Sequence, residues 1–377
     1  MHKDIPVAEI SADCTRVFEI YNTAHYPIGA GKNEPEPLRD NTFRNWILNR
    51  EIPDNRQNIR HIVSVLGKNI DQAAIEAMQV SLTDCYWIKP DESSLSWKDV
   101  NYLDNGFESG YYNAFIAESS SFLLQDVKIP DFTTNGFLSK VWIPNDPPVL
   151  AKFNMIANAK YDIYAANECA AYHLAKLAGV DCTRYFPVQV QSSGLLGCGS
   201  MCVITDSNHE LISAANIQKE KYIIDEQEIY SIISDLGFQK KQDDMIWFDF
   251  LIKNRDRHLG NIFLVRDADT LEFVDYAPLL DNGNCLAVHE SSDITTEYSE
   301  TKPYARTFIE QINLLEEKSI AKRDIPKSAE MAGIIKKIYN KYKIPELLTE
   351  KSIQTVERSR KYLLNIRSHF IDREEIR

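Results

Sequence analysis

Two polar side chains in a short charged stretch have the types and the spacing needed for phosphoryl transfer. Asp256 and Asn261 lie five positions apart in the segment KNRDRHLGN, directly after the apolar run MIWFDFLI. In a tight loop this spacing lets the carboxylate face a substrate hydroxyl while the amide turns toward a metal ion. Asp281, in LLDNG, ends a predicted strand and is placed to reach the same metal. We therefore predict Asp256 as the catalytic aspartate, which orients the hydroxyl and accepts its proton, and Asn261 and Asp281 as Mg²⁺ ligands.

Transfer of a phosphoryl group from ATP also needs a lysine to hold phosphate oxygens and an acid to position that lysine. Lys152 lies in the strand-like segment VLAKFN, and Glu168 lies among apolar residues in NECAAYHLA. Either could simply be a solvated surface charge. An ion pair between them would account for both, because a buried charge without a partner is costly. We predict that Lys152 and Glu168 form such a catalytic pair.

A turn and a strand could complete a nucleotide site. The turn TNGFLSK, residues 134–140, could close over phosphates with its backbone N–H groups and with Lys140. It has one glycine, so it is a weak phosphate loop by itself. The backbone of the strand SMCVIT could meet the adenine. The residues predicted to bind the nucleotide are Lys152, Asn135, Gly136, Lys140, Met201 and Val203.

The apolar periodicity shows which elements would position these residues. A hairpin of residues 262–266 and 271–276 separates Asn261 from Asp281. Upstream, the pattern predicts paired strands at 136–143 and 148–155, an amphipathic helix over 161–180 that stops at Gly179, and strands at 184–191 and 200–205. Nearer the N-terminus it predicts strands at 5–10 and 15–22 and helices at 43–50, 59–67 and 71–82, the last capped by Asp71. From about residue 225 onward the chain is predicted to be mostly helical.

The amino-acid composition restricts the classes of protein to which the chain could belong. The chain has 377 residues, 44% of them hydrophobic and 26% charged, which is ordinary for a soluble globular protein. The net charge of −13 disfavours direct nucleic-acid binding. We expect no signal peptide and no membrane span, because no apolar run reaches about 18 residues. The seven scattered cysteines fit reduced thiols in a cytoplasm, and Cys198 with Cys202 makes a poor metal site because no second ligand pair follows.

Two conspicuous features are weaker candidates than they look. The segment GAGKN at 29–33 resembles the end of a P-loop, but Tyr26 stands at the upstream glycine position and Asn33 stands where Ser or Thr belongs. His258 could be a general base. Because Asp256 already fills that role, a structural hydrogen-bonding histidine is the favoured interpretation.

Taken together, these segments resemble the HipA-type serine/threonine kinases and, more distantly, the phosphatidylinositol kinases. NRDRHLGN followed by DYAPLLDNG is similar to the catalytic and metal-binding segments, and VLAKFN, NECAAYHLAKLAGV and TNGFLSK are similar to the lysine strand, the acid-bearing helix and the single-glycine loop. The resemblance covers roughly residues 130–315. It implies that Asp256 is catalytic, that Asn261 and Asp281 bind magnesium and that Lys152 binds phosphate. It also implies phosphorylation within the loop, for which Thr133 is the nearest matching hydroxyl, with Thr134 and Ser139 as neighbours.

We therefore expect an α+β, two-lobed, protein-kinase-like fold with a small sheet-containing N-lobe and a mainly helical C-lobe. The expected regions are an N-terminal α+β region (1–125), the kinase N-lobe (126–215) and the helical C-lobe (216–377). ATP and Mg²⁺ would be used to phosphorylate a Ser or Thr hydroxyl of a protein substrate, with residues 284–302 as an activation-like segment. We expect a cytoplasmic location, with secretion as an effector as the alternative, and an antitoxin-like protein partner is compatible with this function. A small-molecule or lipid kinase, a non-catalytic nucleotide-binding module and a DNA-associated regulator remain alternatives.

Overall fold

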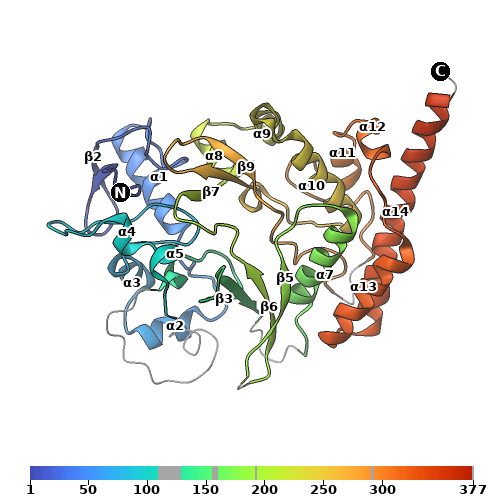
Figure 1. Cartoon of the computed structure of the whole chain (residues 1–377), viewed down its shortest axis with the longest axis horizontal. Coiled ribbons are helices and arrows are strands. Elements are labelled where there is room, and N and C mark those ends of the chain that lie inside the picture. Colours follow the sequence, from blue (N-terminus) through green and yellow to red (C-terminus); the bar gives the residue numbers. More distant parts are fainter. Residues whose placement is uncertain (109–128, 155–159, 192, 290–292, 376–377) are drawn as a thin grey trace. The chain divides into compact units, whose positions relative to one another are not determined.

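The computed structural model of the chain describes residues 1–108, 129–154, 160–191, 193–289 and 293–375. They divide into two compact units. Unit 1 comprises Met1–Ala157, Val188–Ile224 and Phe263–Ala277, and unit 2 comprises Asn158–Pro187, Asp225–Ile262 and Pro278–Arg377. Nearly all strand residues belong to unit 1, whereas helices dominate unit 2 (Figure 1). The predicted α+β, two-lobed fold is thereby confirmed.

A four-stranded sheet has the order β3-β4-β6-β5; β3, β4 and β6 belong to unit 1, whereas β5 is divided between the two units at Val188. Its strands are β3 (Ser139–Ile143), β4 (Val149–Phe153), β5 (Tyr185–Gln189) and β6 (Leu196–Met201). β4 pairs antiparallel with β3 on one side and with β6 on the other. The predicted pairing of the strands around PNDPP is confirmed, because Val141 lies opposite Ala151 and Ile143 opposite Val149.

The predicted strand over residues 200–205 is only partly right, because β6 begins at Leu196 and ends at Met201. Its partner β4 is preceded by Pro147 and Pro148, which have no N–H for the ladder. The last bond along this edge runs from the N–H of Cys202 to the carbonyl of Pro148, at 2.7 Å. Val203 therefore lies beyond the strand.

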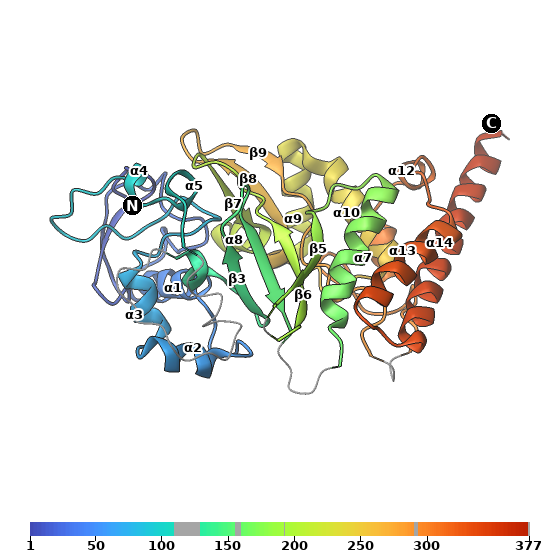
Figure 2. The same ribbon diagram turned by 60° about the horizontal axis from the view of Figure 1, so that its bottom comes forward.

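A second sheet in unit 1 has the order β7-β8-β9 (Figure 2). Its strands are β7 (His209–Ser213), β8 (Phe263–Asp267) and β9 (Phe273–Tyr276), all antiparallel. The predicted hairpin of residues 262–276 is confirmed as β8 and β9. β7 was not predicted from the sequence, and it is the strand that attaches this hairpin to the rest of unit 1.

The N-terminal part of unit 1 begins with a two-stranded antiparallel sheet, β1 (Ala8–Ile10) and β2 (Val17–Ile20), which correspond to the strands predicted at 5–10 and 15–22. The other helical elements of unit 1 are α1 (Glu36–Leu48), α2 (Ile59–Leu66), α3 (Ile70–Glu76), α4 (Trp97–Val100), α5 (Tyr102–Asn105), α8 (Ala214–Glu220) and the 3₁₀ turn at Pro130–Thr133. Ile62 of α2 and Ala74 of α3 share one buried core with Val141 of β3 and Ala151 of β4. Two N-terminal helices thus cover one face of the central sheet.

The residue that caps α3 differs from the one predicted. Asn69 occupies the N-cap position, and Asp71 lies inside the first helical turn. A carboxylate in the first turn is favourable because it faces the positive end of the helix dipole. Asp71 also forms an ion pair with Arg44 of α1.

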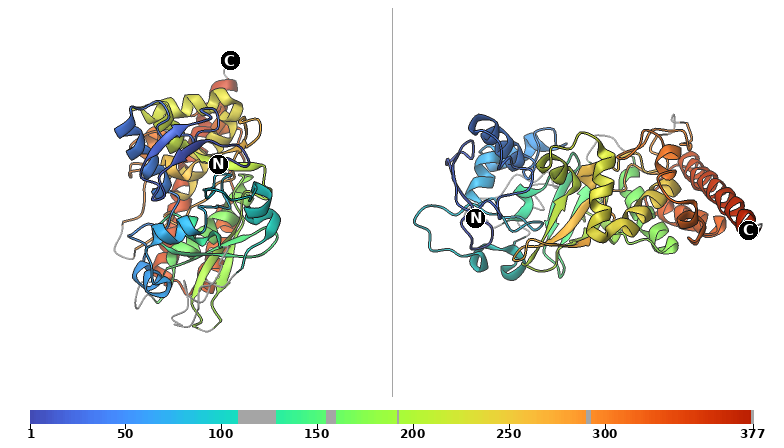
Figure 3. Two further views of the ribbon diagram at one scale, coloured as in Figure 1. Left: turned by 90° about the vertical axis from the view of Figure 1, so that its left-hand side faces the viewer. Right: turned by 90° about the horizontal axis from the view of Figure 1, so that it is seen from above.

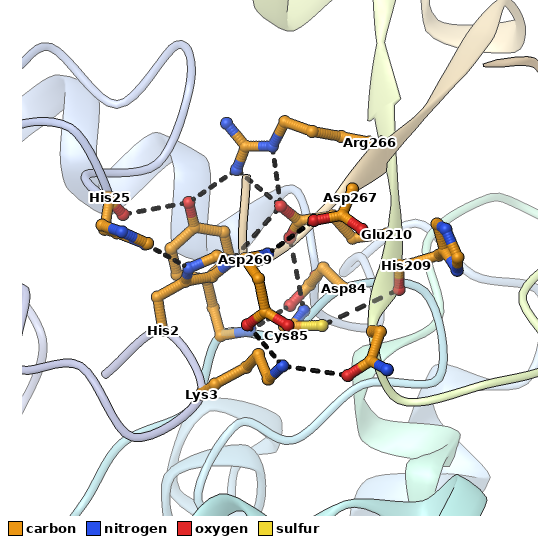
Figure 4. A network of polar contacts seen from close by, with 12 residues as sticks. His2, Lys3, His25, Asp84, Cys85, His209, Glu210, Arg266, Asp267 and Asp269 are labelled. Carbon is orange, nitrogen blue, oxygen red and sulfur yellow. Dashed lines mark hydrogen bonds and ion pairs between the residues drawn. The ribbon is translucent and has the colours of Figure 1, made fainter. Parts of the chain in front are cut away.

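A buried polar network joins the first residues of the chain to β7 and β8 (Figure 4). The carboxylate of Glu210 in β7 accepts a hydrogen bond from Nε of Arg266 in β8 at 2.7 Å, and its Oε1 lies 3.2 Å from Nε2 of His2. Nδ1 of His2 lies 2.8 Å from Nδ1 of His25. Because Glu210 and Arg266 are almost fully buried, each of these two charges depends on the other for compensation.

Unit 2 is built around α7 and α10. Its helices are α7 (Ile163–Ala178), α9 (Glu226–Ile233), α10 (Gln239–Ile252), α11 (Phe308–Ile312), α12 (Glu317–Ala321), α13 (Ser328–Lys341) and α14 (Glu346–Glu375), with a π-helical turn at Ser234–Phe238 and a 3₁₀ turn at Leu259–Asn261. The predicted helix at 161–180 is confirmed as α7, which Asp162 caps and Gly179 ends. α13 and α14 pack side by side at the C-terminal end (Figures 1 and 3).

All seven cysteines are free thiols, and all are buried except the half-buried Cys182. Within the described residues, no cluster of three or more His, Cys, Asp or Glu side chains could hold a metal ion. The same residues include no helix with the length and apolar character needed to cross a membrane.

Candidate active site

The loop that carries Asp256 and Asn261 follows α10 and ends in a 3₁₀ turn. The amide nitrogen of Asn261 donates a hydrogen bond to the backbone carbonyl of Asp256 at 3.0 Å. This bond uses the nitrogen, so the amide oxygen is the atom that can ligate a cation. The N–H of Gly260 donates to Nδ1 of His258 at 3.1 Å, and the N–H of Asn261 donates to the carbonyl of His258. His258 thus has the structural role that the sequence favoured.

The carboxylate of Asp256 remains accessible within this loop. Its side chain is 43% exposed, and Oδ1 lies 3.3 Å from Nζ of Lys302, which is itself half-exposed. The N–H of Asp256 donates to the side-chain oxygen of Asn254 at 3.2 Å. The backbone is therefore held by a hydrogen bond while the carboxylate stays open to solvent.

The loop that carries Asp281 is attached to α7 through Glu168. Oε2 of Glu168, which is 3% exposed, accepts a hydrogen bond from the N–H of Asn282 at 2.7 Å. The N–H of Asp281 donates to the hydroxyl of Tyr185 at 3.1 Å. Asp281 has a φ of +57°, a left-handed conformation that aspartate tolerates better than most residues. The two hydrogen bonds fix this uncommon backbone and with it the position of the carboxylate.

Arg257, which was not among the residues predicted from the sequence, joins the two loops. Its guanidinium donates to both carboxylate oxygens of Asp249 on α10, at 3.0 and 3.2 Å. It also donates to the carbonyls of Asn261, at 3.3 Å, and Leu280, and to the side-chain oxygen of Asn282. Arg257 and Asp249 are both fully buried. The signal in the sequence was Asp249 itself, a lone acid inside the apolar run MIWFDFLI.

In unit 1, Lys140 and Lys152 lie opposite each other in the β3–β4 ladder. Directly paired residues of an antiparallel sheet project from the same face, with Cβ atoms about 5 Å apart. Lys152 is 5% exposed. β6 passes close behind it, because a Cβ at Gly197 would collide with the carbonyl oxygen of Lys152. The sheet thus presents two cations side by side.

The turn before β3 contains the other residues predicted to meet phosphates. Gly136 has a φ of +105°, a conformation open to glycine but strained for other residues. Its N–H donates to the side-chain oxygen of Asn135 at 2.6 Å, and Nζ of Lys140 donates to the carbonyl of Asn135 at 2.5 Å. The hydroxyl of Thr133 is the donor toward the carbonyl oxygens of Val80 and Pro130, each at 3.0 Å.

The structure therefore gathers the predicted site residues into two groups. Unit 2 holds Glu168, Asp256, Asn261 and Asp281, and unit 1 holds Asn135, Gly136, Lys140, Lys152, Met201 and Val203. Within unit 2 the catalytic-loop and metal-loop candidates share one hydrogen-bonded assembly centred on Arg257. The oxygen donors of Asn261 and Asp281 are of the kind that Mg²⁺ prefers, so these residues fit that ion. The pairing of Lys152 with Glu168 stays a prediction.

The solved structures that resemble this chain include two kinase-type proteins. The proinflammatory kinase CtkA of Helicobacter pylori matches with a TM-score of 0.51 and 14% sequence identity, over 63% of this chain and 93% of CtkA. HipA of Shewanella oneidensis MR-1, solved in a toxin–antitoxin complex with HipB and operator DNA, matches with a TM-score of 0.54 and 13% identity, over 98% of both chains. No protein-family model and no curated protein sequence matches the chain.

The structural similarity extends beyond residues 130–315, where the sequence motifs lie, since the match to HipA spans nearly the whole chain. The sequence identities are low, so the likeness concerns the fold. On that ground, the chain has the α+β fold of the HipA-like kinases.

Proposed function

We propose that this chain is an ATP-dependent serine/threonine protein kinase of HipA-like type. The observation that carries the proposal is the assembly around Arg257, which holds the loops of Asp256, Asn261 and Asp281 together in unit 2. A kinase needs a hydroxyl-orienting acid and two oxygen ligands for magnesium near one another. Resemblance to the fold of a known kinase supports the same reading.

In this proposal each residue has a defined task. The bond between the γ-phosphorus of ATP and its bridging oxygen breaks, a bond to the Ser or Thr oxygen of the substrate forms, and ADP leaves. Asp256 orients the hydroxyl and accepts its proton. Asn261 and Asp281 hold Mg²⁺, which when bound offsets phosphate charge. Lys152 and Lys140 contact phosphate oxygens, and the loop at Asn135 and Gly136 offers backbone N–H groups.

Three assignments complete the proposal. Glu168 positions Lys152, the backbone of Met201 and Val203 meets the adenine, and the kinase phosphorylates itself near Thr133. The last step requires the Thr133 hydroxyl to leave the two carbonyls that it contacts. A protein partner comparable to the HipB of the solved HipA complex belongs to the same proposal. Because the chain carries a net charge of −13, any contact with DNA would come from that partner.

Incubation of the protein with Mg-ATP, followed by intact-mass and peptide mass spectrometry, tests this function. Wild type should gain phosphate or transfer it to a generic protein substrate. Asp256→Ala and Asp281→Ala should not, whereas Asp324→Ala, which changes an exposed acid of unit 2, should behave like wild type. Transfer only to a lipid or a small-molecule alcohol would replace the protein-kinase assignment. Undiminished phosphate gain in Asp256→Ala would remove the role given to that residue.

A further inference from the structure

The N-terminal region supplies a buried arginine to the loop 134–140. Arg56 is 1% exposed and precedes α2. Its Nε donates to the carbonyl of Gly136 at 3.1 Å, its Nη1 donates to the hydroxyl of Thr134 at 2.9 Å, and its Nη2 donates to the carbonyl of Thr134. The guanidinium of Arg56 thus donates to three acceptors of a single turn. The planar fork of donors that distinguishes arginine from lysine makes this possible.

The residues next to Arg56 extend this contact along the same turn. The N–H of Gln57 donates to the carbonyl of Phe137 at 3.0 Å, and its side chain donates to the side-chain oxygen of Asn154 at 2.7 Å. The N–H of Ile52 donates to the carbonyl of Phe132 at 3.1 Å. Residues 52–57 therefore lie along the turn that leads into β3 and occupy its carbonyl oxygens.

This arrangement fixes where the backbone N–H groups of the turn point. In a trans peptide the carbonyl and the N–H of the same unit point in opposite directions. The carbonyls of Thr134, Gly136 and Phe137 face residues 56 and 57. The N–H groups of residues 135, 137 and 138 consequently face away from them. N–H groups that share one side of a turn form an anion-binding surface.

The positive charge of Arg56 also favours an anion beside this turn. Burial lowers the pKa of Arg56 to about 10, while the nearby Asp131 acts to raise it, so the guanidinium stays protonated at neutral pH. A cation bonded to the carbonyl oxygens polarises the peptide units toward stronger donation from their N–H groups. Arg56 therefore favours an anion on the opposite side of the loop without touching it.

We propose that Arg56 is a positioning residue for nucleotide phosphates and that residues 52–57 make the N-terminal region a required part of the nucleotide site. This inference rests on the proposed function, in which the loop 134–140 receives the phosphates of ATP. Arg56 acts through the loop and is not a catalytic residue. The N-terminal region thereby gains a role that no sequence motif indicated.

Nucleotide titration of the full chain tests the inference, with Arg56→Met compared with Arg60→Met. Arg60 lies four residues later, is exposed, and loses the same charge when replaced. Arg56→Met should bind Mg-ATP and Mg-ADP about 10- to 100-fold more weakly, since charge-assisted bonds that hold the loop are lost. Its affinity for adenosine, which has no phosphate, should stay within about twofold of wild type because that ligand does not use the loop. In turnover assays KM for ATP should rise more than kcat falls.

Equal phosphate affinities for Arg56→Met and Arg60→Met would overturn the inference and leave the proposed function intact. A wild type that binds no Mg-ATP would overturn both. If Arg56→Met does not fold, amide hydrogen exchange of wild type gives the answer. Mg-ADP should slow exchange in peptides of 134–140 and of 52–57 together. Protection of the loop with unchanged exchange at 52–57 would refute the coupling.

Discussion

Lys140 and Lys152 lie directly opposite each other on β3 and β4, so two ammonium groups leave the same face of one sheet. Like charges in this position destabilise a ladder. In the proposed function both lysines contact one anionic ligand, which would offset this repulsion. The phosphates of ATP fit that requirement in the proposed site.

Replacing each lysine separately measures its own contribution to catalysis with ATP. Lys152→Met should lower kcat/KM by about 10²- to 10³-fold, as loss of a buried charge-stabilising group does. Lys140→Met should lower it by about tenfold, because its less buried ammonium is screened by water. Steady-state kinetics with varied ATP measures both, and Lys98→Met, at an exposed position of α4, is the control. Equal losses in all three variants would contradict a phosphate role for the pair.

Breaking the buried pair of Arg257 and Asp249 should destabilise unit 2 strongly. Arg257→Met or Asp249→Leu should each lower the free energy of unfolding by about 3–5 kcal/mol, because each leaves a buried charge without its partner. The double variant should cost less than the sum of the two. Urea denaturation of the four proteins measures this coupling. Strict additivity would show that the two side chains act independently.

The stability of unit 1 should fall as pH rises through neutrality because of Asp131. Burial raises the pKa of Asp131 to about 7, although the Trp142 N–H and the charge of Arg56 act to lower it. A carboxyl group whose pKa is raised by folding stabilises the folded state while protonated. That contribution is complete below about pH 4 and is lost as pH rises through about 7, at no more than about 1.4 kcal/mol per pH unit.

Thermal or urea unfolding between pH 5 and pH 8 checks this expectation. Asp131→Asn keeps an oxygen that can accept from the Trp142 N–H, and it should remove this part of the pH dependence. Its relative stability against wild type should therefore improve at pH 8. An unchanged pH profile in Asp131→Asn would assign the effect to other groups.

Glu210 should contribute more to stability than an exposed acid of the same sheet region. Although burial acts to raise it, the hydrogen bond from His2 and the charge of Arg266 together lower the pKa of Glu210. Glu210→Ala would leave Arg266 buried without its carboxylate and should cost about 3 kcal/mol or more. Asp206→Ala, which removes the partly exposed pair with His209, should cost less than about 1 kcal/mol. Comparable losses in urea denaturation would contradict the role given to burial.

A structural feature could be predicted from the sequence where the interactions that form it join residues close together in the chain. The strands around PNDPP, helix α7 and the β8–β9 hairpin were predictable because their signals lie within one element or one turn. The spacing of Asp256 and Asn261 likewise belongs to one loop. Glu168 was found as a buried-looking acid, but its bond to the N–H of Asn282 joins residues 114 positions apart.

The residues that the sequence did not reveal act over long chain separations. Arg56 contacts a turn about 80 positions away, and nothing in its neighbourhood marks it as different from Arg60. β7 was missed because its pattern is recognisable only beside β8. In the sequence Arg257 looked like one more cation in a charged loop, and although Asp249 stood out as a lone acid, only the structure shows that the two form a buried pair.

The burial of the native cysteines makes it practical to label the loop 134–140 and to follow it in solution. Burial raises the pKa of Cys14 to about 11 and those of Cys169 and Cys202 to about 12, and the thiolate is the form that alkylating reagents attack. The native thiols should therefore react slowly with maleimides while the protein is folded. A single cysteine introduced by Phe137→Cys, at a side chain that is 55% exposed, would take a fluorophore selectively. The wild-type sequence thus already serves as a background for site-specific labelling.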